Sequence, residues 1–193
     1  MRAQQVLDAG TSIWLDDLSR AKISGADSHS LPSRIATSGV VGVTTNPSIF
    51  NSAITGSTDY AADISSMKLL SPEEIVKKLT TDDVRDACDL FSEIYSKTAG
   101  VDGRVSIEVD PRLAHETEAT IAEGKSLWAL VDRPNLMIKV PATLAGLPAI
   151  TELIASGISV NVTLIFSCKR YEEVIDAFIS GIEGAHQRGL DVS

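Results

Sequence analysis

Cysteine and long apolar stretches are the features that this sequence most clearly lacks. Its 193 residues include only two cysteines, Cys88 and Cys168, and neither has the spacing of a metal site. Because isolated thiols fit a reducing compartment, we expect a cytoplasmic protein without a metal. No segment approaches the roughly 18 apolar residues of a membrane span. Residues 1–17 also lack the apolar core of a signal peptide, so we expect neither a membrane protein nor a secreted one.

Positive charge is also in short supply. The chain has 17 Lys and Arg residues against 26 Asp and Glu residues, which gives a net charge of −9. An acidic surface repels nucleic acids and anionic membranes, so we expect neither as a partner. A small anionic substrate stays possible, because one local basic pocket is enough to bind it. A hydrophobic fraction of 44% is that of an ordinary globular protein.

Short apolar runs alternate with longer amphipathic segments along the whole chain. We predict strands at 11–16, 40–45, 104–110, 135–140 and 158–166. Helical patterns occupy 29–39, a long region from 47 to 99, 115–131, 144–156 and 169–189. In the long region, Ser71, Pro72 and Glu74 form the pattern of a helix start with a capping box. The alternation predicts a parallel α/β sheet in one domain, 1–193, either doubly wound or part of a barrel.

The two faces of the predicted strands differ in a consistent way. In the strand at 104–110, Val105, Ile107 and Val109 share one face, and polar side chains occupy the other. A doubly wound sheet buries both faces, whereas the inner face of a barrel can be polar at the carboxyl end, where active sites lie. The pattern favours a (β/α)8 TIM barrel, here about its first five βα units. The polar residues that it directs to one opening are Asp16, Thr44, Asn46, Ser106, Glu108, Lys139, Asn161 and Thr163.

Each of these residues also has an ordinary structural interpretation. A strand-end Asn or Thr is usually a cap, and Lys139 alone could be a lysine that reaches solvent. That interpretation does not explain why the polar residues share one parity and one end in every strand. An inward lysine amine can attack a carbonyl and form a Schiff base, which draws electrons from a neighbouring C–C bond. Asp16 and Glu108 supply carboxylates for the proton transfers.

Several motifs in the same strands resemble those of the transaldolase family. GVTTNPSIF at 42–50 resembles the first signature of that family, and the segment that begins NLMIKVPAT at 135 resembles the second. VSIEVDPRL and WLDDLSR also match strands of the family. The resemblance runs from Trp14 to Gly189. The chain is similar to the N-terminal portion of the long-chain, actinobacterial-type subgroup.

The resemblance implies a role for each inward polar residue. Lys139 forms the Schiff base, and Glu108 acts as acid and base through a water held by Thr163. Asp16 is the acid and base at the C–C bond that is cleaved. A polar shell binds the substrate: Thr44, Asn46, Ser106 and Asn161. The family reaction moves a dihydroxyacetone unit from a ketose phosphate such as sedoheptulose 7-phosphate to an aldose phosphate such as glyceraldehyde 3-phosphate, in the pentose phosphate pathway. It needs no cofactor and no metal.

The predicted strands end well short of a full barrel. A (β/α)8 barrel typically takes about 250 residues, and the sixth to eighth strands of the family have no counterpart here. The serine and arginine that bind the substrate phosphate in the family are on the sixth strand. We therefore expect little autonomous activity and self-association through unpaired sheet edges. Two alternatives stay open: a non-catalytic fragment, and a lyase that resembles fructose-6-phosphate aldolase, although those chains lack the long insertion between the second and third strands.

Overall fold

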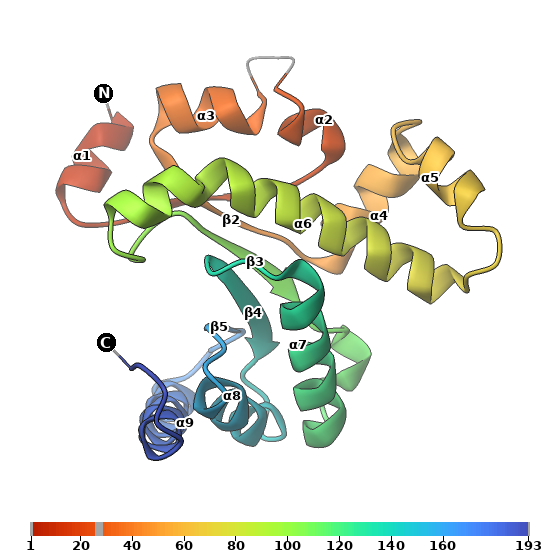
Figure 1. Ribbon diagram of the computed structural model, residues 1–193. Coiled ribbons are helices and arrows are strands. Elements are labelled where there is room, and N and C mark those ends of the chain that lie inside the picture. The colour runs from red at the N-terminus through yellow and green to blue at the C-terminus, as the bar shows by residue number, and fades with distance from the viewer. Residues whose placement is uncertain (1, 26–28, 193) are drawn as a thin grey trace. The chain divides into compact units, whose positions relative to one another are not determined.

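The computed structural model describes residues 2–25 and 29–192 (Figure 1). The chain divides into two compact units, Met1–Ser106 with Arg133–Asn135, and Ile107–Asp132 with Leu136–Ser193. Within the described residues, five strands form one sheet in the order β1-β2-β3-β4-β5. Their bounds are Ile13–Asp16 for β1, Val40–Thr44 for β2, Arg104–Glu108 for β3, Leu136–Pro141 for β4 and Val160–Thr163 for β5.

The strand order decides between the two fold classes that the sequence left open. Each strand lies beside the next one in the chain, and the registered pairs β1–β2, β2–β3 and β4–β5 are parallel. A doubly wound sheet reverses its strand order at a switch point, whereas a barrel keeps the order of the chain. The α/β fold with successive parallel strands therefore confirms the predicted barrel class.

The helices of the first unit precede β1 or follow β1 and β2. They are α1 (Arg2–Asp8), α2 (Arg20–Ile23), α3 (Leu31–Ser38), α4 (Pro47–Gly56), α5 (Ala61–Ser66) and α6 (Pro72–Lys97). The predicted capping box at the start of α6 is confirmed: Ser71 Oγ accepts from the Glu74 amide at 3.2 Å, and Glu74 Oε2 accepts from the Ser71 amide at 2.8 Å. The long helical region predicted for 47–99 consists of three separate helices, α4, α5 and α6, and the last of them begins at the predicted cap.

A buried asparagine joins α6 to the strands of the first unit. Asn135 is 2% exposed, and its Nδ2 donates to the carbonyl oxygens of Cys88 at 2.9 Å and Gly103 at 2.8 Å. Gly103 has a φ of +77°, and a Cβ there would collide with the backbone of Tyr95. The close approach of α6 to β3 therefore depends on a residue without a side chain.

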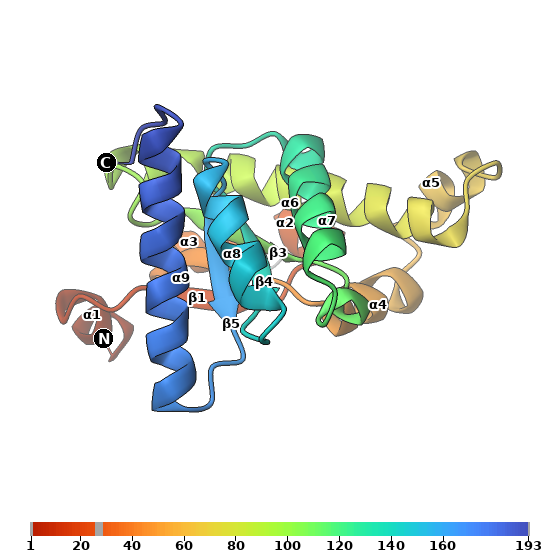
Figure 2. The same ribbon diagram turned by 90° about the horizontal axis from the view of Figure 1, so that it is seen from below.

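The second unit contains the remaining helices. They are the 3-10 turn η1 (Pro111–Leu113), α7 (Thr117–Val131), α8 (Gly146–Ala155) and α9 (Cys168–Gln187). Figure 2 shows α8 and α9 side by side. β5 is shorter than the predicted strand at 158–166, because Leu164 adopts a φ of +61° and ends the extended backbone. Among the described residues, no helix has both the length and the apolar character needed to cross a membrane.

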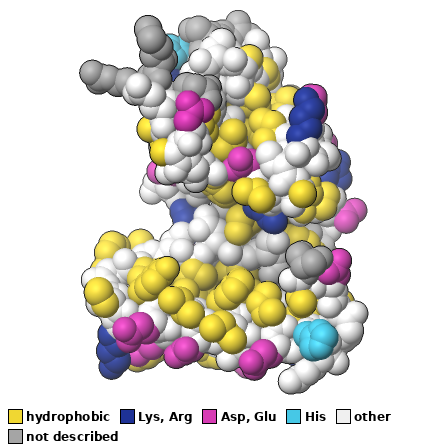
Figure 3. All heavy atoms as spheres, turned by 90° about the vertical axis from the view of Figure 1, so that its left-hand side faces the viewer, with side chains coloured by type: hydrophobic (Ala, Val, Ile, Leu, Met, Phe, Trp, Pro, Cys, Tyr) yellow, Lys and Arg dark blue, Asp and Glu magenta, His cyan; other side chains and the backbone are white. Residues whose placement is uncertain are grey.

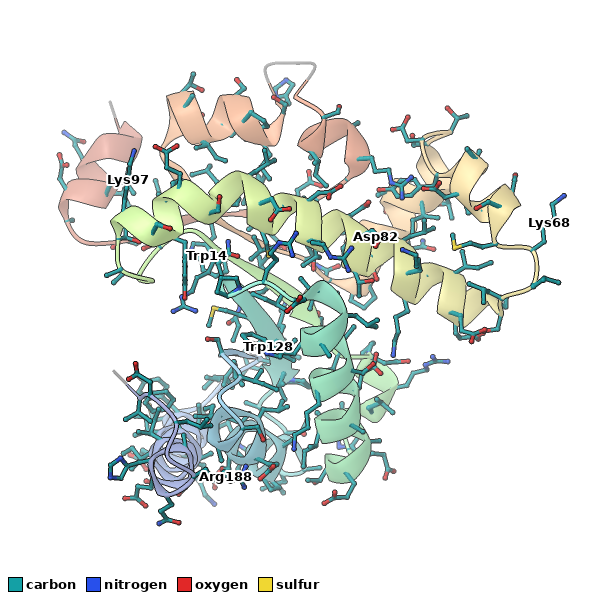
Figure 4. The ribbon with its side chains drawn as sticks, in the orientation of Figure 1. Trp14, Lys68, Asp82, Lys97, Trp128 and Arg188 are labelled. Carbon is teal, nitrogen blue, oxygen red and sulfur yellow. The ribbon has the colours of Figure 1, made fainter. Side chains whose placement is uncertain are left out.

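A carboxylate network connects the three long helices of the second unit. Glu152 on α8 accepts from Lys125 of α7 at 2.8 Å, and from Arg188, which follows α9 (Figure 4), at 2.8 and 3.2 Å. Hydrogen bonds from Arg188 and then Lys125 lower the pKa of Glu152 from 4.5 to about 2. The carboxylate form is therefore the one that stabilises the folded state.

Replacing Glu152 with glutamine should destabilise the protein at pH 7, but by less than about 1 kcal/mol because all three side chains are partly exposed. The folded-state pKa is depressed, so the contribution is complete above about pH 4.5 and declines as the pH falls towards 2. Denaturant melts of E152Q and the unchanged protein between pH 7 and pH 3 should converge. The exposed Glu172→Gln is the matched control on α9, and a gap that widens in acid would contradict the assignment.

Candidate active site

Lys139 lies on the face of β4 that the sequence predicted. Leu136, Ile138 and Val140 are 0% exposed, whereas Met137 and Lys139 between them are partly exposed. This alternation follows from the two-residue period of a strand and confirms the parity predicted for β4. The amide of Val109, just after β3, donates to the carbonyl oxygen of Lys139 at 3.2 Å. That bond places the carboxyl end of β3 beside Lys139.

Glu108 is the ionic partner of Lys139. The distance from Lys139 Nζ to Glu108 Oε2 is 3.3 Å, and the two side chains are only 14% and 13% exposed. Removing two charges from water is costly, and their attraction offsets the cost only when the geometry is good. A nearly buried amine beside a carboxylate provides a nucleophile and a group that can exchange protons with it.

β5 brings two further predicted residues to this part of the second unit. Asn161 is in register with Lys139, and Thr163 is in register with Pro141. Within residues 2–25 and 29–192, the Thr163 Oγ1 atom is buried and has no hydrogen-bond partner. A buried hydroxyl without a partner is uncommon in folded proteins. Thr163 therefore has the capacity to bind a water or a substrate atom near the carboxyl ends of β4 and β5.

The other predicted residues belong to the first unit. Asp16 of β1 is in register with Thr44 of β2, which is in register with Ser106 of β3. Asp16 is exposed, whereas Ser106 is fully buried. Asn46 is the N-cap of α4, and its Oδ1 accepts from the Ile49 amide at 3.0 Å. The cap uses the amide oxygen of Asn46 and leaves its NH2 group for other partners.

Trp14 and Gly42 form a contact on the polar face of the first unit. They are in register on β1 and β2, and a Cβ on Gly42 would lie 2.5 Å from the Trp14 ring. This close contact leaves no room for a side chain at position 42. Figure 4 labels Trp14 where it projects from β1. Sequence reasoning assigned it no role, although its shared parity with Gly42 and Asp16 was a usable signal.

Arg170 is a residue near the site that sequence reasoning missed. Its Nη1 donates to the carbonyl oxygen of Ala142 at 3.0 Å, and its Nε forms an ion pair with Glu173 at 2.9 Å. Ala142 in turn donates through its amide to the Thr163 carbonyl oxygen at 2.8 Å. These bonds connect the end of β4 to β5 and to the first turn of α9. No local pattern could reveal them, because they join residues far apart in the sequence.

Metal ligation has no support in the described part of the chain. In residues 2–25 and 29–192, no three or more His, Cys, Asp or Glu side chains are grouped so as to hold a metal ion.

Successive parallel strands and a lysine–carboxylate pair at their carboxyl ends place the chain among the barrel-type α/β proteins. The chain belongs to the transaldolase/fructose-6-phosphate aldolase family, whose model matches residues 13–189. This match confirms the predicted family.

Curated relatives agree with the family match. Transaldolase 1 of Streptomyces avermitilis is 56% identical over 192 residues, which cover 98% of this chain and 50% of that protein. A transaldolase of an Arthrobacter species is 57% identical over 192 residues, 98% of this chain and 51% of its own. The transaldolase of Thermobifida fusca is 53% identical with the same coverage. The chain thus spans about half the length of the curated relatives it matches.

Proposed function

We propose that this chain carries the Schiff-base centre of a transaldolase. The reaction transfers a dihydroxyacetone unit from sedoheptulose 7-phosphate to glyceraldehyde 3-phosphate, a step of the pentose phosphate pathway. The observation that carries the proposal is the 3.3 Å contact between Lys139 Nζ and Glu108 Oε2, with both side chains nearly buried. Membership of the family and the names of the relatives support sugar phosphates as the substrates.

Lys139 acts as the nucleophile in this proposal. Its neutral amine attacks the C2 carbonyl carbon of the ketose phosphate, and loss of one water converts the carbinolamine into an iminium ion. Glu108 returns a proton to the departing hydroxyl through a water bound to Thr163 Oγ1. The partnerless hydroxyl of Thr163, among the described residues, supports that task.

Asp16 acts at the bond that breaks. It takes the proton of the C4 hydroxyl while the C3–C4 electron pair moves into the iminium, which becomes an enamine. The shortened aldose phosphate leaves. The enamine carbon then attacks the aldehyde carbon of the acceptor, Asp16 returns the proton to the new hydroxyl, and water releases the product from Lys139. Every proton and electron pair is returned, so the cycle needs no cofactor.

A polar shell binds the substrate hydroxyls in this proposal. Asn161 is in register with Lys139 and is the shell residue of the second unit. Thr44, Asn46 and Ser106 are its members in the first unit. Asn46 offers its NH2 group, since the amide oxygen caps α4. Ser106 is fully buried, so in this proposal it holds the other shell residues in place and does not contact the substrate itself. Cys88 and Cys168 are both free thiols, which supports the proposal of a cytoplasmic location.

Product analysis should separate transfer from cleavage. Joined in frame to the remaining half of Streptomyces avermitilis Transaldolase 1, the chain should convert sedoheptulose 7-phosphate and glyceraldehyde 3-phosphate into erythrose 4-phosphate and fructose 6-phosphate, measured by chromatography with mass detection. The chain alone should give little of either product. Because Lys139 is the nucleophile, Lys139→Met should abolish the reaction. Lys125→Met, on a lysine that pairs only with Glu152 among the contacts described, is the matched control.

Three other outcomes have separate meanings. Free dihydroxyacetone from fructose 6-phosphate, without an acceptor, would identify the lyase alternative. Absence of product together with a reducible adduct at Lys139 would leave the Schiff-base centre in place but without turnover. Absence of both product and adduct would support the non-catalytic alternative and contradict the proposed function.

A further inference from the structure

Arg20, the first residue of α2, connects three segments of the first unit. Its Nε donates to Asp83 Oδ1 on α6 at 3.0 Å, and its Nη1 donates to the Asp59 carbonyl oxygen at 3.1 Å. The Nη1 atom also forms an ion pair with Asp63 on α5 at 2.5 Å. A guanidinium group presents its donors in a rigid plane, so the three acceptors hold it in one orientation. The start of α2 is thereby attached to α5 and α6.

Tyr60 contacts Arg20 through both the backbone and the side chain. The Tyr60 hydroxyl accepts from the Arg20 amide at 3.2 Å and donates to Asp83 Oδ2 at 2.7 Å. The Arg20 guanidinium lies 4.5 Å from the centre of the Tyr60 ring, which adds a cation–π contact. Burial, and then the hydrogen bond to Asp83, raises the pKa of Tyr60, so the hydroxyl keeps the proton that it donates. We call Arg20, Tyr60 and Asp83 the Arg20 network.

Burial distinguishes the Arg20 network from ion pairs at the surface. Figure 3 shows Lys and Arg side chains beside acidic ones at the surface of one face. Water screens such pairs, and a pair such as Lys97 with Glu93, 71% and 76% exposed, restricts the chain little. In the Arg20 network, the Asp83 side chain is 2% exposed and Tyr60 is 1% exposed. A buried polar network whose members all have partners is rigid, so the start of α2 has one defined position.

Asp16 lies at the end of β1, and only residues 17–19 separate it from Arg20. The Asp16 side chain is exposed, so its position depends on the backbone that carries it and not on packing around it. On one side that backbone is held by the pairing of β1 with β2. On the other side, Leu18 is 0% exposed and Ser19 caps α2, immediately before Arg20. The Arg20 network therefore holds the far end of the short segment that follows Asp16.

We propose that Arg20 is a positioning residue for Asp16. By attaching the start of α2 to α5 and α6, it sets the path of residues 17–19 and with it the place of the Asp16 carboxylate. The inference rests on the proposed function, in which Asp16 takes the proton of the C4 hydroxyl as the C3–C4 bond breaks. A misplacement of about 1 Å can slow a chemical step by about 10²-fold.

The proposal predicts a selective defect. Loss of Arg20 should slow cleavage of the C3–C4 bond, the step that uses Asp16. It should leave formation of the imine unchanged, because that step uses Lys139 and Glu108, which belong to the second unit. A network that only stabilised the first unit would give no such separation of the two steps.

Trapped adducts measure both steps on the same lysine. The joined chain, which is this chain fused in frame to the remaining half of Streptomyces avermitilis Transaldolase 1, is mixed with fructose 6-phosphate and reduced with borohydride at timed intervals. Before cleavage, reduction leaves a six-carbon sugar phosphate on Lys139. After cleavage, the enamine gains a proton at carbon and reduction leaves a three-carbon dihydroxyacetone unit. Intact mass separates the two adducts, and their ratio does not depend on the folded fraction, because unfolded chains form neither.

Arg20→Met should slow conversion of the six-carbon adduct into the three-carbon adduct by about 10-fold or more, with the rate of total adduct formation within about 2-fold. Arg20→Lys keeps the charge but not the planar group, so it should slow conversion less. Tyr60→Phe removes the acceptor of the Arg20 amide and should also slow it. Arg85→Met is the matched control and should change neither rate: Arg85 lines the same pocket and is 30% exposed, and it pairs with Asp82 within α6.

Three results would overturn the proposal. The first is a ratio of adducts in R20M equal to that of the unchanged joined chain. The second is equal slowing of imine formation and cleavage, and the third is slow cleavage in R85M as well. If R20M does not fold, R20K and Y60F decide by the same ratio. Absence of any adduct on Lys139 in the unchanged joined chain is a different result, because it contradicts the proposed function itself.

Discussion

Replacing Glu108 with glutamine should slow formation of the Lys139 imine by about 10²–10⁴-fold, the usual contribution of a positioned proton-transfer group. Glutamine keeps the shape of Glu108 but cannot take up or return a proton. The Oε2 atom of Glu108 is 3.3 Å from the nucleophile, so the loss acts on the chemical step itself. Borohydride trapping with fructose 6-phosphate at timed intervals measures the rate.

Ketose affinity separates this role from a binding role. Calorimetry should find that E108Q binds fructose 6-phosphate within a few-fold of the unchanged protein, since the polar shell is intact. Glu118→Gln, an exposed residue of α7, is the control and should change neither rate nor affinity. A loss of trapping rate smaller than a few-fold would remove Glu108 from the proposed mechanism.

Asp83→Ala should destabilise the protein by about 3 kcal/mol, the lower end of the range for removal of one partner from a buried ion pair. Asp83 on α6 is 1% exposed. Its Oδ1 accepts from Arg20 Nε at 3.0 Å and its Oδ2 accepts from the Tyr60 hydroxyl at 2.7 Å. The substitution leaves the buried Tyr60 hydroxyl without this acceptor, so a hydrogen bond to Asp83 no longer offsets the cost of removing that hydroxyl from water.

Two facts keep the expected effect at the lower end of that range. Burial raises the pKa of Asp83 despite its hydrogen bonds to Tyr60 and Arg20, so the carboxylate already carries a desolvation cost in the folded protein. Arg20 also lines a pocket of about 580 Å³ and keeps its ion pair with Asp63 at 2.5 Å. Its charge is therefore not left wholly unpaired when Asp83 is removed.

The adjacent residue Asp82 is the matched control, and Figure 4 labels it on α6. It pairs with Lys78 at 2.6 Å and Arg85 at 2.8 Å, and its side chain is 29% exposed. Pairs at the surface contribute less than about 1 kcal/mol, so Asp82→Ala should change the free energy of unfolding by no more than that. Equal losses in D82A and D83A, measured by denaturant titration, would show that burial of Asp83 is not the cause.

Most of the fold could be predicted because local patterns agree with it. Period-two alternation identified the strand that contains Lys139, and the capping box located the start of α6. The end of β5 could not be predicted, since nothing in the sequence requires Leu164 to adopt a φ of +61°. The break between α4 and α5 was also hidden: Tyr60 precedes α5 without a side-chain cap, so the usual N-terminal signal is absent.

The site was predictable where it depends on strands that are neighbours in sequence. Parity placed Glu108 and Lys139 on one face, and the pairing of β3 with β4 brings them into contact. Contacts made by side chains of helices gave no such signal. Arg170 reaches the Ala142 carbonyl oxygen across 28 residues, and Arg20 reaches Asp83 across 63. Neither pair has a spacing that periodicity could reveal.

Reductive trapping tests the Schiff-base assignment most directly. The protein is incubated with fructose 6-phosphate, reduced with borohydride, weighed intact by mass spectrometry and digested for peptide mapping. We predict one adduct per chain, located on Lys139, and none in Lys139→Met. An adduct on any other lysine, or an adduct of equal yield in K139M, would contradict the account.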